Sequence, residues 1–181
     1  INLWLENCLI LQTKFYKRII LHGNSIIINN KAYLIIADAG FGKSTLCAAL
    51  SKQFACPILT DDIAVISSDG KTIYGCSRSI CLRDDTINFL KIQNQEASTM
   101  YCIKKDKKYI KDSYNNIIAP SFELESIFFG GIDSTATNLS IKELSKLESF
   151  KMLHNNIRFP MLYNDDNFYL NIIKNIANNT K

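Results

Sequence analysis

The stretch from Leu34 to Ile66 constrains the fold of this 181-residue chain more than any other. It reads LIIADAGFGKSTLCAALSKQFACPILTDDIAVI: an apolar run, a glycine-containing loop, a segment with helical spacing and a second apolar run. A strand, a loop ending in Lys43 and Ser44, and a helix predict a phosphate-binding site, because loop N–H groups and the helix dipole attract anions. The sequence therefore predicts an α/β fold that binds a nucleotide at this loop.

The predicted phosphate loop, ADAGFGKST, departs from the usual pattern at its first position, where Ala37 stands in place of a glycine. Gly40 and Gly42 still let the backbone turn its N–H groups inward, and Lys43 can place a positive charge on phosphate oxygens. Ser44 can offer its hydroxyl to a magnesium ion. The predicted nucleotide-binding residues are Ala39, Gly40, Phe41, Gly42, Lys43, Ser44 and Thr45.

The segments on both sides of the loop fit a sheet that packs against a helix. Two apolar runs, Ser25–Ile28 and Ala32–Ile36, flank an Asn-Asn-Lys turn and predict a hairpin that leads into the loop. After the loop, apolar residues recur at helical spacing and predict a helix with one buried face. That face consists of Leu46, Ala49, Leu50 and Phe54.

Two adjacent carboxylates, Asp61 and Asp62, stand at the end of the apolar run that follows this helix. A strand next to the phosphate loop would bring them to the magnesium ion that accompanies a nucleotide. Consecutive side chains of a strand point to opposite sides, so the two carboxylates are predicted to have different roles. One can hold the metal while the other faces the substrate.

Three features resemble, in their order and spacing, the catalytic domain of HPr kinase/phosphorylase and its smaller relatives: His22-Gly23, the loop ADAGFGKST and the strand end LTDDIAVI. Those relatives include kinases that act on lasso-peptide precursors. The resemblance is strong from His22 to Ile66 and loose elsewhere. It implies a mixed β-sheet P-loop kinase domain of the HPr kinase and phosphoenolpyruvate carboxykinase type, with helices toward the C-terminus.

The resemblance also implies a role for each site residue, with ATP and Mg²⁺ as cofactors. Lys43 and Ser44 would bind the triphosphate and magnesium, Asp61 would be the general base for a serine hydroxyl, and Asp62 would be a metal ligand. His22 would lie by the phosphates. A serine hydroxyl must lose its proton as it attacks the γ-phosphorus, and a carboxylate within reach can accept that proton. The predicted catalytic residues are therefore Asp61, Lys43 and His22, and the predicted metal ligands are Ser44 and Asp62.

A second signature of the bifunctional enzymes, a Glu-Ile-Arg-Gly-type stretch associated with phosphorylase activity and partner binding, has no counterpart between Gly75 and Lys105. The chain therefore resembles the short kinase-only relatives, and the expected acceptor is a serine of a peptide or protein. Two alternatives stay open: phosphorylation of a small hydroxylated molecule such as free serine, and nucleotide binding without catalysis.

Three basic residues are candidates for substrate contacts. Arg78 and Arg83 lie shortly after the aspartates, and Lys108 belongs to the basic segment YCIKKDKKYI, which predicts a hairpin with a lysine-rich turn. Arg158 lies in a connector between two predicted C-terminal helices, from which it could approach the site.

The remaining pattern predicts short strands and then helices. Ser68–Lys71 is a turn signal between two short apolar runs, and Asp84-Asp85 can cap a helix that reaches about Gln93. An apolar strand is predicted over Leu124–Ile132 and ends at Gly130-Gly131. Ser140-Ile141-Lys142-Glu143 fits a capping box, and Asp165–Ala177 has Phe168, Ile172 and Ile176 at helical spacing.

Composition predicts one globular domain over residues 1–181, since 47% of the residues are hydrophobic and 21% are charged. The chain begins at Ile1, so an upstream part is left open.

A net charge of +4 without a long basic run argues against nucleic acid as a partner. The six scattered cysteines favour reduced thiols in a cytoplasmic protein, and no apolar run approaches the roughly 20 residues of a membrane span. Homo-oligomerisation is left open.

Overall fold

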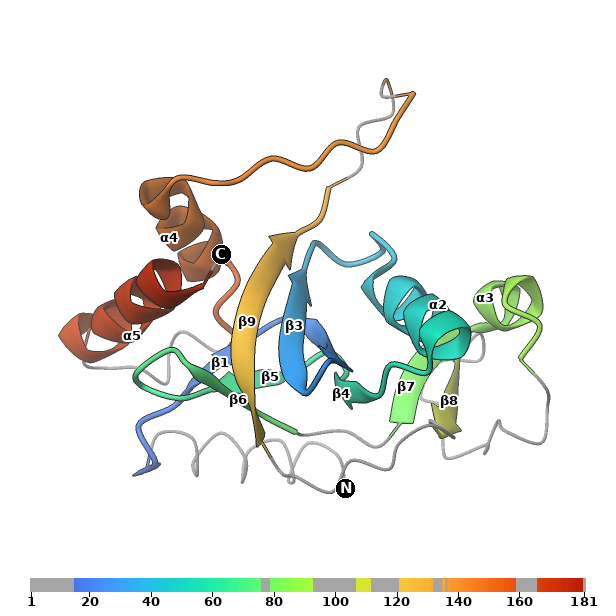
Figure 1. Ribbon diagram of the computed structural model, residues 1–181, viewed down its shortest axis with the longest axis horizontal. Coiled ribbons are helices and arrows are strands. Elements are labelled where there is room, and N and C mark those ends of the chain that lie inside the picture. Colours follow the sequence, from blue (N-terminus) through green and yellow to red (C-terminus); the bar gives the residue numbers. More distant parts are fainter. Residues whose placement is uncertain are drawn as a thin grey trace.

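A mixed seven-stranded sheet lies at the centre of the computed structural model, which describes residues 15–75, 79–92, 107–111, 121–131, 135, 137–158 and 166–180 (Figure 1). The strand order is β1-β5-β6-β9-β3-β2-β4, and β7 pairs with β8 in a separate sheet. The strands are β1 Ile19–Leu21, β2 Asn24–Ile28, β3 Lys31–Ile36, β4 Ile58–Thr60, β5 Ala64–Ile66, β6 Thr72–Tyr74, β7 Ser79–Arg83, β8 Lys107–Lys111 and β9 Ser121–Phe129. The helices are α2 Lys43–Phe54, α3 Asp84–Phe89, α4 Lys146–Asn155 and α5 Asp166–Asn179.

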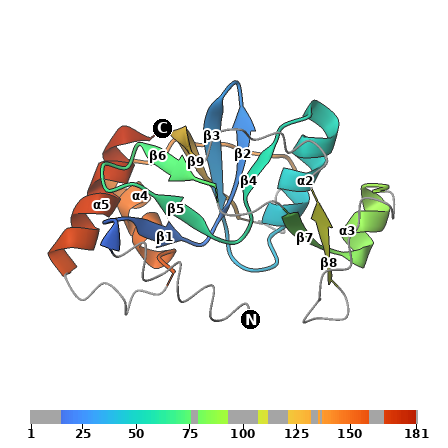
Figure 2. The same ribbon diagram turned by 90° about the horizontal axis from the view of Figure 1, so that it is seen from below.

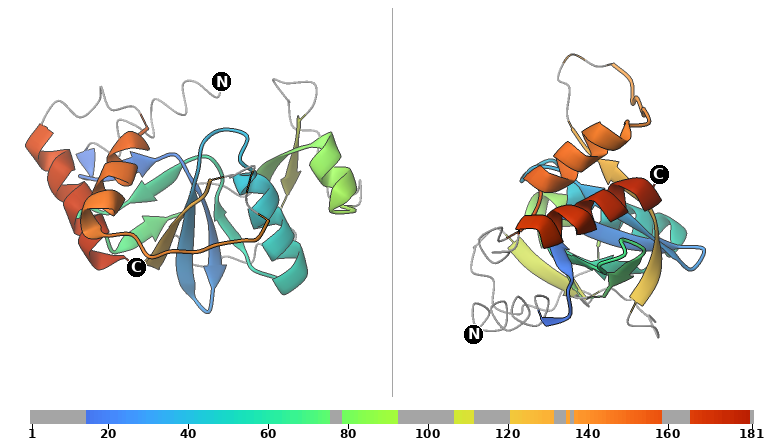
Figure 3. Two further views of the ribbon diagram at one scale, coloured as in Figure 1. Left: turned by 90° about the horizontal axis from the view of Figure 1, so that it is seen from above. Right: turned by 90° about the vertical axis from the view of Figure 1, so that its left-hand side faces the viewer.

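Helices cover both faces of this sheet. Along β3, Leu34 and Ile36 belong to a core that contains residues of α4 and α5, whereas Ile35 belongs to a core beneath α2. Because successive side chains of a strand point to opposite faces, α2 lies on one face and the C-terminal helices lie on the other. Figure 1 and the two views of Figure 3 show α4 and α5 at one end of the sheet and α2 toward the other. None of the helices in the described part of the chain combines the length and apolarity needed to cross a bilayer.

Two of the three predicted hairpins are confirmed. β2 and β3 pair antiparallel around Asn29 and Asn30, whose φ angles of 50° and 63° lie in the left-handed region that asparagine tolerates (Figure 2). β5 and β6 also pair antiparallel. Their turn contains Gly70 at φ 74°, where an added Cβ would lie 2.7 Å from the backbone nitrogen of Ile176 in α5. This glycine therefore lets the hairpin dock closely against the C-terminal helix.

Helix α2 forms as predicted, but the predicted buried face is only partly correct: Leu50 packs against the core beneath the helix, whereas two other predicted residues do not. Leu46 and Phe54 are 47% and 61% exposed, whereas Cys47, Ala48 and Ser51 are buried. Lys43, Cys47 and Ser51 recur every fourth residue, so they form one stripe along the helix. The buried face of α2 therefore has the loop lysine at its start.

The boundaries of three other elements differ from the sequence prediction. β9 runs over Ser121–Phe129, so it begins before the predicted strand, and it ends immediately before Gly130. α3 ends at Phe89, and its N-cap residue is Arg83. Lys107 and Lys108 lie in strand β8 and not in a turn, because they pair with β7. The other half of that predicted hairpin lies outside the described residues.

The capping box of α4 is formed by Ser145 and Glu148, so the prediction for Ser140 and Glu143 is wrong. The Ser145 hydroxyl accepts from the Glu148 backbone N–H at 3.3 Å, and the Glu148 carboxylate accepts from the Ser145 backbone N–H at 2.9 Å. The Ser-x-x-Glu pattern occurs twice, and the second copy caps the helix, which buries Leu153, whereas Ile141 of the first copy is exposed. Further along, Ile172 and Ile176 of α5 are buried, and Phe168 packs against the same core, as predicted.

The two Ser-x-x-Glu copies provide a matched test of this assignment. Ser145→Ala should lower the free energy of unfolding by about 1 kcal/mol, because it removes the N-cap hydroxyl of α4. Ser140→Ala should change it by less than about 0.5 kcal/mol, as expected for an exposed position with no cap. Urea unfolding followed by circular dichroism measures both. Equal losses in the two variants would contradict the assignment.

Candidate functional site

The order of the strands brings the phosphate loop and the aspartates together. β2 pairs antiparallel with β3 on one side and with β4 on the other. The loop follows the end of β3, and Asp61 and Asp62 follow the end of β4. Because β2 runs opposite to both neighbours, its first residue, Asn24, lies beside the ends from which the loop and the aspartates emerge. His22 and Gly23 immediately precede that residue.

The loop has the backbone conformation that an anion site needs. Gly40 and Gly42 have φ angles of 91° and 84°, and a Cβ added at either position would meet nothing within 4 Å. Glycine is therefore required here for its backbone conformation and not for space. Gly42 is the N-cap residue of α2, and no side chain caps this helix. The N–H groups of the first turn of α2 can therefore face a phosphate.

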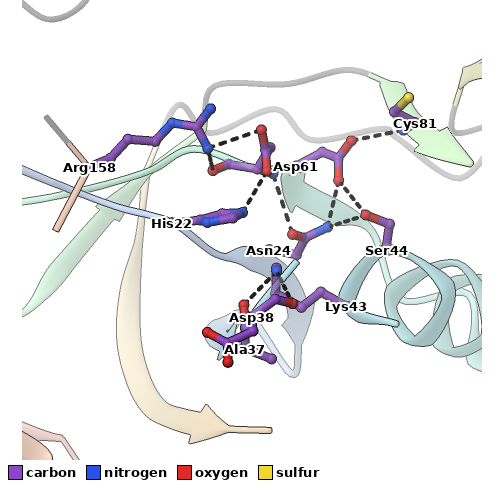
Figure 4. A network of polar contacts seen from close by, with 10 residues as sticks. His22, Asn24, Ala37, Asp38, Lys43, Ser44, Asp61, Cys81 and Arg158 are labelled. Atoms are coloured by element: carbon purple, nitrogen blue, oxygen red, sulfur yellow. Dashed lines mark hydrogen bonds and ion pairs between the residues drawn. The ribbon is translucent and has the colours of Figure 1, made fainter. Parts of the chain in front are cut away.

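Lys43 is buried and lies against its own loop. Its Nζ donates to the carbonyl oxygens of Ala37 at 2.6 Å and Asp38 at 3.2 Å (Figure 4). Burial lowers the pKa of this amine below its ordinary value, although Asp62, Asp38 and Asp61 act in the opposite direction. The residue that departs from the loop pattern, Ala37, thus supplies its carbonyl to the lysine.

Asp61 is the centre of the polar contacts in Figure 4. Its Oδ1 accepts from Ser44 Oγ at 3.0 Å and from Asn24 Nδ2 at 2.5 Å, and its Oδ2 accepts from the Cys81 backbone N–H at 2.8 Å. Burial raises the pKa of this carboxyl above its ordinary value, and the three hydrogen bonds oppose that shift. The carboxylate therefore connects the first turn of α2 with the ends of β2 and β4 and with strand β7.

Asp62 faces the opposite way and is exposed. Its Oδ1 lies 2.8 Å from His22 Nε2, and its Oδ2 lies 3.1 Å from Arg158 Nη1. β4 ends at Thr60, and Asp62 has a φ angle of 69°, which is uncommon for a residue other than glycine. This backbone turn supports the prediction that the two aspartates face different surroundings. Non-glycine residues in this conformation are enriched at functional sites.

His22 and Arg158 are held beside Asp62 through their backbones. The His22 N–H donates to the carbonyl of Asn156 at 3.0 Å, and the Arg158 N–H donates to the carbonyl of Ile20 at 3.0 Å. Burial lowers the pKa of His22 below 6.5, and the nearby Asp62 carboxylate only partly reverses the shift. Arg158, which follows α4, brings the C-terminal part of the chain to the site.

The other predicted site residues belong to the loop and to the region around α3. Phe41 is partly exposed on the loop, and Thr45 Oγ1 lies 3.3 Å from Thr86 Oγ1 of α3. Arg83 is exposed at the start of α3, and Lys108 forms an ion pair with Asp84 at 2.9 Å. Ala39 is exposed within the loop. Arg78 lies outside the described residues.

Sequence reasoning missed two contributors, Asn24 and Cys81. Asn24 is only 1% exposed, although it opens an apolar strand. The sequence did contain a signal for Asn24, since this polar residue stands between His22-Gly23 and a β-branched run. An amide buried at such a position needs hydrogen-bond partners, which would have indicated nearby polar groups. Cys81 acts through its backbone N–H, which no side-chain pattern could have indicated.

The residues present fit a magnesium site completed by a nucleotide. No group of three or more His, Cys, Asp or Glu side chains able to hold a metal occurs among the residues that the structure describes. Mg²⁺ is usually bound through one or two carboxylates together with substrate phosphates and water, so a smaller set of oxygen ligands is sufficient. The Ser44 hydroxyl and Asp61 Oδ1, which lie 3.0 Å apart, are oxygens of this kind, whereas the carboxylate of the predicted ligand Asp62 faces His22 and Arg158.

The sequence matches no protein-family model and no curated protein. Among solved structures, the chain is similar to the Hpr(Ser) kinase/phosphatase from Coxiella burnetii, with a TM-score of 0.39 and 15% sequence identity. The similarity covers 61% of this chain and 63% of that chain, which is less than two thirds of its length. The described residues form a mixed α/β fold, and any assignment of function depends on the site itself.

The ionisation of His22 provides a test of the site geometry. NMR titration of the imidazole in the nucleotide-free protein should give a pKa below 6.5. Asp62→Asn should lower the pKa further, because it removes the charge that favours the imidazolium. Arg158→Gln should raise it, because it removes a repulsive positive charge. A His22 pKa above 6.5, or shifts of the opposite sign in the two variants, would contradict the described arrangement.

Proposed function

We propose that this protein is a kinase that uses ATP and magnesium to transfer the γ-phosphate to a serine hydroxyl of a peptide or protein. The observation that carries the proposal is the 3.0 Å hydrogen bond between Ser44 of the phosphate loop and Asp61. It places a carboxylate at the first turn of the helix, where phosphates and their metal would meet. Transfer of a phosphoryl group needs mainly this kind of positioning and charge stabilisation.

The loop and the start of α2 would hold the phosphate donor. Gly40 and Gly42 turn the backbone inward, and the uncapped first turn offers N–H groups to the phosphate oxygens. Lys43 lies inside the loop, where its amine can exchange a carbonyl partner for a phosphate oxygen. A bound magnesium ion would supply positive charge to the transferring group, with Ser44 and one of the two aspartates as its protein ligands.

The two aspartates divide the remaining tasks. On the assignment implied by the resemblance, Asp61 accepts the serine proton as its oxygen attacks phosphorus, and Asp62 binds the metal. The contacts also support the reverse, since Asp61 shares an oxygen with Ser44, whereas Asp62 is exposed beside His22. In either case the proton passes from the hydroxyl to a carboxylate, the new O–P bond forms, and ADP leaves.

The exposure of Asp62 supports a large acceptor. Its carboxylate and Arg158 lie where a serine carried on a peptide could reach them from solvent. A precursor of a ribosomally made peptide, including the lasso type, belongs to this class of acceptor. We propose a cytoplasmic location, because ATP and reduced thiols are both found there.

Transfer from labelled ATP to a panel of serine-ended peptides, HPr and free serine tests the proposal. We expect magnesium-dependent labelling of a peptide or protein hydroxyl. Labelling of free serine alone would replace the proposal with a small-molecule kinase. Tight nucleotide binding without transfer to any hydroxyl would contradict catalysis and favour a nucleotide-binding module.

The matched variants Asp61→Asn and Asp62→Asn serve as the control and separate the two roles. Loss of the general base should lower the transfer rate by about 10²–10⁴-fold while ATP binding stays nearly intact. Loss of a metal ligand should weaken the binding of ATP in the presence of magnesium as well. Asp61→Asn is expected to show the first pattern, and loss of both properties would make Asp61 mainly a metal ligand.

A further inference from the structure

Asn24 makes more contacts within the site than its place in an apolar strand would suggest. Its Nδ2 donates to Ser44 Oγ at 3.1 Å and to Asp61 Oδ1 at 2.5 Å, and its Oδ1 accepts from the Asp62 backbone N–H at 3.4 Å. Figure 4 shows the amide between Ser44 and Asp61. One buried side chain therefore contacts the phosphate loop and both aspartates.

The chemistry of these contacts fixes which way the amide faces. Nδ2 is a donor only, and it points at a hydroxyl oxygen and a carboxylate oxygen, which can both accept. In the opposite orientation, the oxygen of Asn24 would face the Asp61 carboxylate, and the NH₂ group would face the Asp62 N–H. Both contacts would then be repulsive in a buried place, so the amide stays a donor to Ser44 and Asp61.

The backbone around Asn24 is itself held firmly. A Cβ added at Gly23 would lie 2.8 Å from Leu34 Cδ1 and 2.9 Å from the carbonyl oxygen of Ile35. The chain therefore packs directly on β3 immediately before Asn24. Asn24 is then paired with Ile35 in the register of β2 and β3. A residue anchored in this way can serve as a fixed reference point for side chains that come from other elements.

We propose that Asn24 is a positioning residue that fixes Ser44 Oγ, a proposed ligand for the magnesium ion of a bound nucleotide, relative to the Asp61 carboxylate, the proposed general base. The inference rests on the proposed function for the presence of that nucleotide. Ser44 lies in the first turn of α2 and Asp61 follows β4, and a direct hydrogen bond joins them. Asn24 donates to both side chains and so ties this pair to β2, and it acts as a hydrogen-bond donor and not as a metal ligand itself.

The next residue on β2 provides a matched control. Ser25 is also buried, and its hydroxyl lies 2.9 Å from Thr60 Oγ1 on β4. Successive side chains on a strand point to opposite faces, so Ser25 faces away from the side on which Asn24 lies. Ser25→Ala removes a buried polar contact between the same two strands without touching Ser44 or Asp61. It therefore reports on general loosening of the strand pair.

The test is calorimetric titration of the full chain with ATP, once with excess Mg²⁺ and once with EDTA. We expect magnesium to strengthen ATP binding in the unaltered protein. Asn24→Ala and Asn24→Asp should each reduce this gain by about 10–100-fold, the usual effect of losing a residue that orients metal ligands. Their affinity for ATP in EDTA should stay within about twofold of the unaltered protein, since the loop is intact. Ser25→Ala should keep the full gain.

Three results would overturn the inference. An unchanged gain in the Asn24 variants would show that the amide does not position the ligands. A preserved or larger gain in Asn24→Asp would make residue 24 a metal ligand. If Ser25→Ala loses as much of the magnesium-dependent increase in ATP affinity as the Asn24 variants, the effect is a general one on the pairing of β2 and β4. Thermal unfolding checks that each variant is folded.

The binding experiment also separates this inference from the kinase proposal. If magnesium-dependent binding requires Asn24 but no hydroxyl is phosphorylated, the kinase proposal fails and the role of Asn24 stands. If phosphate is transferred and the Asn24 variants keep the magnesium gain, the inference fails and the kinase proposal stands.

Discussion

The hydrogen bond from Ser44 to Asp61 is the contact on which the arrangement of the site depends. It joins the start of α2 to the end of β4, two elements that meet only because β2 runs antiparallel between β3 and β4. The strand order therefore places two groups at the same end of three neighbouring strands: the loop, which is suited to bind phosphates, and the Asp61 carboxylate. Asn24, the first residue of the middle strand, completes the connection. Buried polar groups of this kind are stable only when each finds a partner, and here the partners are the groups expected to contact a nucleotide and its metal.

The adjacent aspartates divide the site into a buried half and an exposed half. Asp61 lies among hydrogen-bond donors near the helix, whereas Asp62, in a left-handed backbone conformation, lies with His22 and Arg158 at the surface. A phosphoryl-transfer enzyme needs both environments, one that holds the donor away from water and one that admits the acceptor. The conformation of Asp62 is the local feature that produces this division, because it turns the chain between two consecutive carboxylates.

Local sequence signals predicted the parts of the fold that local physics determines. Asn29 and Asn30 indicated a hairpin because asparagine tolerates the left-handed region, and Gly40 and Gly42 marked a loop that needs the same freedom. Signals that depend on tertiary contacts were less informative. The buried face of α2 was predicted only in part, because Leu46 and Phe54 are exposed while the polar residues Lys43 and Ser51 are buried. Asn24 could not be assigned because its partners lie 20 and 37 residues away in the chain. The roles of the two aspartates stay predictions for the same reason, since they depend on what binds between them.

A crystal structure of the protein with magnesium and a non-hydrolysable ATP analogue would show whether a nucleotide and its metal bind at this site. We expect the triphosphate against the loop ADAGFGKST, with the metal bound by Ser44 Oγ and a carboxylate of the aspartate pair. We also expect Asn24 still to donate its hydrogen bond to Asp61. A nucleotide bound elsewhere on the sheet, or phosphates at the loop with a metal that contacts neither Ser44 nor the aspartates, would contradict it.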